Sequence, residues 1–147
     1  MCIFFPASKF PEENRTKIAN ELVRYMSIYY INYDLLIYWC MMTHIEEYHE
    51  NHFFDFFWEN PFNSSNVEIS NKKNRSGVYF LHGGLHLYRN ILGRTYKQTS
   101  MGIDILALFG DNHDTGAIPL FISEGTYHHK LQSIYQSDYL SLCFLLL

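Results

Sequence analysis

A run of four apolar residues, Val78 to Leu81, leads directly into His82, Gly83 and Gly84. The run has no polar alternation, which is the pattern of a strand buried on both faces of a parallel sheet. In open α/β sheets, ligands bind beyond the carboxyl ends of the strands, and His82 would lie there. The two glycines can adopt a positive φ and let a ligand or another backbone approach closely. The stretch therefore predicts a strand that ends either in a site or in an ordinary turn.

The segments around this strand alternate between helical and strand-like patterns. We expect helices over 11–26, 35–42, 103–109, 128–135 and 139–147, and strands over 27–31, 78–81, 118–122 and, as a strand or short excursion, 93–99. Strands that alternate with helices favour a parallel sheet with helices packed on its faces. The fold class predicted is α/β, with a partial Rossmann-like parallel sheet and helices on both faces.

The chain of 147 residues is long enough for a single domain with a sizeable core. Within it, residues 44–76 are irregular, acidic and aromatic, and we interpret them as an insertion or lid. The aromatic cluster Phe53 to Trp58 is assigned no site role, because most such clusters pack a core or a lid. The chain stops inside the apolar run Leu142 to Leu147, which favours a fragment of a longer domain.

Charge and cysteine content exclude several classes of function. The net charge is −4 and there is no run of Lys or Arg, so we expect no nucleic-acid partner. The long apolar stretches are interrupted or far shorter than the ~20 residues that cross a membrane, so we expect no membrane span. Cys2, Cys40 and Cys143 are far apart and form no C-x-x-C motif, which suggests neither disulfides nor a zinc site and is typical of a cytoplasmic protein.

Three polar corners follow predicted strands, and together they resemble a known family. The corners are Asn32-Tyr33-Asp34, Leu81-His82-Gly83 and Ser123-Glu124-Gly125. The first two are similar to the corners of the sirtuin-like NAD-binding superfamily, and the chain resembles an uncharacterised prokaryotic branch of it, a domain of unknown function. The segments that carry the resemblance are Asn32 to Trp39, Tyr79 to Leu87, Pro119 to Thr126 and Lys130 to Leu140.

The resemblance implies a nicotinamide dinucleotide as substrate or ligand, bound at these corners. It assigns Asn32 and Asp34 to the nicotinamide ribose, with Tyr33 beside them, and His82 to proton transfer from a ribose hydroxyl. Gly83 and Gly84 would admit the cofactor. An imidazole can accept a proton near neutral pH, and a carboxylate can stabilise an oxocarbenium-like transition state. Hydrolysis of the nicotinamide–ribose bond is the reaction implied.

Other readings of the same residues stay open. The glycine-rich phosphate turn of sirtuin-like domains has no counterpart in residues 1–26, which contain no glycine. An inactive remnant or a non-enzymatic interaction module is therefore the alternative. Asn32 and Asp34 could serve only as a turn and a helix cap. His82 and His86 are four residues apart, but the intervening glycines disfavour the helix that a metal site would need, so we predict no metal.

Overall fold

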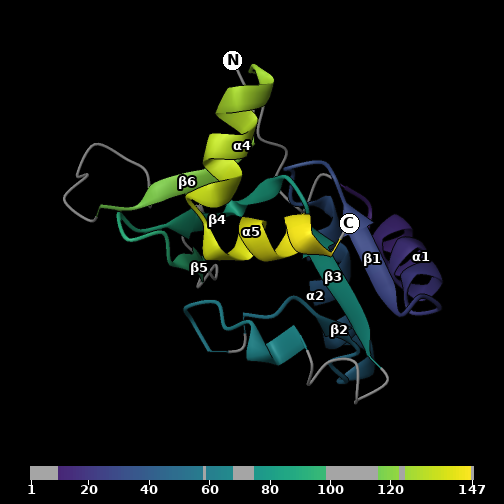
Figure 1. Ribbon diagram of the computed structural model, residues 1–147. Helices are drawn as coiled ribbons and strands as arrows, with labels where there is room; N and C mark the ends of the chain where they lie inside the picture. Colours follow the sequence, from purple (N-terminus) through teal and green to yellow (C-terminus); the bar gives the residue numbers. More distant parts are fainter. Residues whose placement is uncertain (1–9, 58, 68–74, 99–115, 123–124, 147) are drawn as a thin grey trace.

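The computed structural model describes residues 10–57, 59–67, 75–98, 116–122 and 125–146. Its elements form a mixed α/β arrangement, in which helices surround two small sheets (Figure 1). In chain order they are α1 Glu12–Leu22, β1 Ser27–Tyr30, α2 Leu36–Tyr48, β2 Phe53–Phe54, β3 Ser76–Phe80, β4 Gly83–Arg89, β5 Thr95–Lys97, β6 Ile118–Phe121, α4 Tyr127–Tyr135 and α5 Asp138–Leu145. The helix expected at 103–109 lies outside the described residues.

The first sheet is parallel, with strand order β1-β3-β2. The register sets Tyr30 of β1 beside Phe80 of β3, and Phe54 of β2 beside Gly77. All five residues of β3 are buried, as expected for a central strand whose side chains are apolar on both faces. The predicted buried strand and the parallel sheet are therefore confirmed.

The second sheet is antiparallel, with order β5-β4-β6, and it differs from the prediction. The strand expected near 118–122 is present, but it pairs antiparallel with β4 instead of joining the parallel sheet. β4 itself was not expected, because its first two residues are Gly83 and Gly84. Gly83 has φ +75°, which glycine adopts readily, so the backbone can change course after β3 and start a new strand there. These strands therefore do not form a single, wholly parallel, Rossmann-like sheet.

Two predicted helices follow β6, and each begins at a hydroxyl cap. The Thr126 side chain accepts from the His129 amide at the start of α4, and Ser137 accepts from the Leu140 amide at the start of α5. The break expected near Ser137 is confirmed. Asp138 then accepts a hydrogen bond from the Thr95 amide of β5, so the beginning of α5 is tied to the second sheet.

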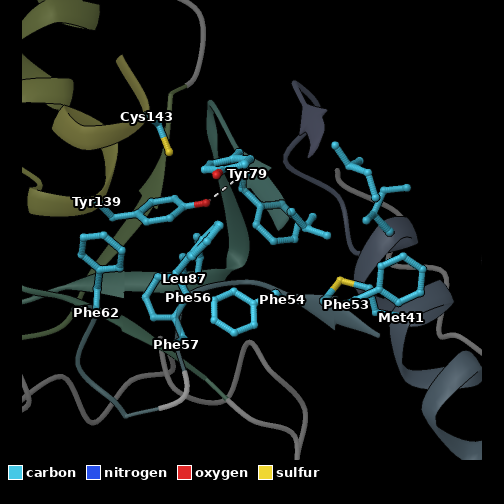
Figure 2. Close-up of a cluster of buried hydrophobic side chains, with 14 of the residues drawn as sticks. Met41, Phe53, Phe54, Phe56, Phe57, Phe62, Tyr79, Leu87, Tyr139 and Cys143 are labelled. Atoms are coloured by element: carbon cyan, nitrogen blue, oxygen red, sulfur yellow. Dashed lines mark hydrogen bonds between the residues drawn. The ribbon is translucent and has the colours of Figure 1, made fainter. Parts of the chain in front are cut away.

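The aromatic residues of the predicted insertion form part of the core (Figure 2). Phe53 and Phe54 belong to β2, and Phe56 and Phe57 follow it; all four side chains are buried. Tyr139 of α5 reaches the same core, and its hydroxyl accepts a 2.7 Å hydrogen bond from the Phe80 amide. These rings hold α5 against β3, so this part of the 44–76 region packs the sheet. α2 also extends into it, to Tyr48.

Candidate functional site

The carboxyl ends of β1 and β3 bring two of the predicted corners side by side. The Leu81 amide donates to the Tyr30 carbonyl at 2.9 Å, which continues the parallel ladder past both strands. Beyond that point the Leu85 amide of β4 donates to the Tyr33 carbonyl, also at 2.9 Å. One of these bonds lies at the end of both strands, and the other joins Tyr33 of the first corner to the residue two positions after Gly83 of the second, so the two corners lie side by side. This proximity is what a site at the carboxyl edge of a parallel sheet requires.

Asp34 is held at this edge by two hydrogen bonds. Its Oδ1 accepts from the Tyr30 hydroxyl at 2.6 Å and from the Leu36 amide at 2.8 Å. The second bond caps the first turn of α2, although Leu35 occupies the N-cap position. The described residues offer no hydrogen bond to Oδ2, which leaves one carboxylate oxygen available to a ligand.

Tyr30 is a member of this site that the sequence analysis did not identify. Burial raises the pKa of its phenol well above the ordinary value, and the hydrogen bond to Asp34 and the charge of that carboxylate raise it further. The side-chain amide of Asn32 opposes the shift. The phenol therefore stays protonated and donates to Asp34. The only signal in the sequence is a tyrosine at the end of a strand, four residues before an acid, which is too common to be diagnostic.

Asn32, Tyr33 and His82 all present side chains to solvent. The Tyr33 ring lies against Phe121 of β6, with ring centroids 5.7 Å apart. The His82 carbonyl accepts from the Ile122 amide at 2.8 Å, so the end of β6 also reaches this edge. The third predicted corner begins there, but Ser123 and Glu124 lie outside the described residues.

The two predicted cofactor glycines are in close contact with the protein itself. A Cβ on Gly83 would lie 2.1 Å from the Leu120 carbonyl oxygen, so the residue is needed for the approach of β6. A Cβ on Gly84 would lie 2.9 Å from Cε1 of His86. The sequence left two uses for these glycines, close approach of a ligand and close approach of another part of the chain. The contacts of both glycines correspond to the second use.

His86 lies in the core and does not pair with His82. Its ring is fully buried between Tyr38 and Phe80, at centroid distances of 5.1 and 4.6 Å. Within the part of the chain that the structure describes, neither ring nitrogen has a hydrogen-bond partner. Burial lowers the pKa of His86 to about 4; the Asp55 carboxylate opposes the shift and the Lys97 ammonium reinforces it. His86 is therefore a neutral core residue near physiological pH.

The surface hollows of the molecule lie away from this edge. Surface hollows of about 490 and 470 Å³ lie on either side of Asp138, at the start of α5, and neither is lined by a predicted site residue. Within the described ranges, no group of three or more His, Cys, Asp or Glu side chains could hold a metal ion. Among the helices of the same ranges, none is long and apolar enough to span a membrane.

The family model described as a domain of unknown function, DUF4917, matches residues 6–145. The chain belongs to this family. The match extends over both sheets and includes Asn32, Asp34 and His82, so the edge described above is part of the DUF4917 domain. No curated protein and no solved structure matches the chain.

Proposed function

We propose that this DUF4917 domain binds a nicotinamide dinucleotide at the carboxyl edge of β1 and β3 and hydrolyses its nicotinamide–ribose bond. The observation that carries the proposal is the juxtaposition of the Asn32–Asp34 corner with the His82 turn, through the two hydrogen bonds to the Tyr30 and Tyr33 carbonyls. An amide, a carboxylate and an imidazole on one exposed edge are the groups that this cleavage needs. The resemblance of these corners to sirtuin-like domains supplies the choice of nucleotide.

Each group has a distinct role in the proposed reaction. Oδ2 of Asp34 faces the ribose carbon as positive charge develops on it, while Oδ1 is held by Tyr30 and the start of α2. His82 accepts a proton from a ribose hydroxyl. Asn32 orients the attacking water, which forms the new C–O bond as nicotinamide leaves with the electrons of the C–N bond. The water gives one proton to the ribose oxygen that His82 has deprotonated, and His82 releases its proton to solvent. The two buried free thiols, Cys40 and Cys143, fit the reducing cytoplasm that we propose as its location.

The second candidate is a domain that keeps the fold but has no enzymatic activity. It is favoured by the contacts of Gly83, whose missing Cβ makes room for Leu120 and not for a cofactor. It is also favoured by the absence of glycine from residues 1–26, where a phosphate-binding turn would be expected. Under this reading Asp34 serves only to cap α2 and to fix Tyr30.

Nicotinamide release from NAD, measured by chromatography, separates the two candidates. We expect His82→Ala to lower the rate by at least ~100-fold, in the range seen for loss of a general base. Asp34→Asn is the sharper variant, because an amide oxygen still accepts from Tyr30 and Leu36 while the charge is lost. His128→Ala, at an exposed histidine of α4, is the matched control and should release nicotinamide at the wild-type rate. Wild-type protein that neither binds NAD nor releases nicotinamide would establish the non-enzymatic candidate.

A further inference from the structure

The outer edge of β1 carries main-chain groups that no other described strand pairs. β1 is hydrogen-bonded to β3 alone. The Met26 carbonyl accepts from the Gly77 amide of β3, and the Tyr30 carbonyl accepts from the Leu81 amide just after β3. Because main-chain groups alternate in direction along a strand, those of Ser27, Tyr29 and Ile31 point the other way. Among the residues that the structure describes, none donates to or accepts from them through the backbone.

The side chains along this edge lack the features that usually prevent strand pairing. Proteins protect exposed edges with lysine, proline or bulges. Residues 25–31 contain no charged residue and no proline. Tyr29 is 48% exposed and Ile31 59% exposed, so both are accessible to a partner. The edge is thus chemically suited to receive another extended strand.

We propose that the edge of β1 pairs antiparallel with β1 of a second copy of this chain, with Tyr29 on the two-fold axis. In this register Tyr29 faces its own counterpart, and Ser27 faces Ile31 of the other copy. All of these residues have outward main-chain groups, so each pair can exchange hydrogen bonds as an antiparallel ladder requires. The contact is self-complementary, as a closed dimer needs.

The charges that flank the edge favour the same orientation. Arg24 precedes β1; it lies 3.5 Å from the Glu21 carboxylate but keeps a side chain that is 72% exposed, whereas Asp34 follows β1. An antiparallel copy brings the basic end of one strand next to the acidic end of the other. A parallel copy would place like charges together, which is unfavourable. The second copy is therefore the occupant that the edge fits by both hydrogen bonding and charge.

Sedimentation equilibrium of the purified full chain tests the dimer. We expect a mass that rises with concentration towards twice the 17.5 kDa of the monomer. Tyr29→Lys places two ammonium groups at the two-fold axis and should weaken dimerisation by at least ~10-fold, since like charges opposite each other are destabilising. Tyr135→Lys, at an exposed tyrosine of α4, is the control with the same chemical change and should dimerise like the wild type. A wild-type monomer at all concentrations up to ~100 µM, or a dimer that Tyr29→Lys leaves intact, would overturn the proposal.

A second pair of variants keeps the test decisive if Tyr29→Lys does not fold. Ile31→Pro removes one outward N–H but no hydrogen bond to β3. This variant should be folded by circular dichroism and monomeric by sedimentation equilibrium. Tyr29→Cys tests the register, because facing Cα atoms in a hydrogen-bonded antiparallel pair lie about 5.5 Å apart, within disulfide range. We expect Tyr29→Cys to form a covalent dimer under mild oxidation, above the wild-type background. Tyr135→Cys should not exceed that background, and equal crosslinking of the two variants would refute the register.

Discussion

Acidification should destabilise the fold through His86. The imidazole is neutral in the folded state, where its pKa is about 4, and it titrates near its ordinary value of 6.5 in the unfolded chain. Above pH 6.5 both states are neutral and the group has no effect on the pH dependence. Between pH 6.5 and 4 the unfolded chain takes up a proton that the folded chain does not, so stability falls as the pH falls. Below pH 4 the loss is complete.

The pKa difference sets the size of the effect. One pKa unit corresponds to about 1.4 kcal/mol, so the full loss is about 3 kcal/mol, of which about 2.5 kcal/mol is reached by pH 4.5. The ring is fully buried, so solvent does not screen its charge and the whole free-energy difference applies. The charged or titratable groups around it are Tyr38 of α2, Asp55 beyond β2 and Lys97 of β5. Since a small domain has a total stability of only 5–15 kcal/mol, as a rough range, the loss is a large fraction of it.

Urea unfolding at pH 7, 6, 5 and 4.5, followed by circular dichroism, measures this effect. His86→Leu removes the titrating group together with two unpartnered buried nitrogens. It should therefore remain folded at pH 7 and lose about 2.5 kcal/mol less than the wild type between pH 7 and 4.5. His128→Leu makes the same change at an exposed position and should keep the wild-type pH dependence. If His86→Leu loses as much stability as the wild type, the reasoning is wrong.

Two further predictions concern single contacts. Gly83→Ala should destabilise the domain by roughly 1–3 kcal/mol or more, because the new Cβ meets the Leu120 carbonyl at a backbone φ of +75°. Gly125→Ala, whose Cβ would make only ordinary contacts, is the control in the same thermal unfolding assay; equal losses in the two variants would contradict this assignment. Lys97→Met should cost about 3–5 kcal/mol, since it leaves the Asp55 carboxylate, 7% exposed, without its 2.6 Å ion pair. Addition of Asp55→Asn should recover part of that loss, and an additive double variant would exclude the pairing as the cause.

The local sequence pattern was sufficient to predict those elements whose surroundings are the same along their whole length. Val78 to Phe80 of β3 lack polar alternation, and this part was predicted because a strand buried on both faces needs none. A break between two helices was predicted near Ser137 and Asp138, and the structure shows that Ser137 caps α5 there. The candidate site was predicted as a set of corners, and the structure does bring Asn32–Asp34 beside His82. Whether those corners bind NAD is still a prediction.

The sequence by itself determined that β1, β3, β6, α4 and α5 form and which polar groups follow the strands, because hydrophobic runs act over a few residues. Only the tertiary structure decided how these segments pair. Gly83 starts an antiparallel strand because Leu120, distant in sequence, needs the space that a Cβ would fill. The aromatic run at Phe53 joins the core because β3 and Tyr139 pack around it. Such choices depend on long-range contacts, which no local pattern records.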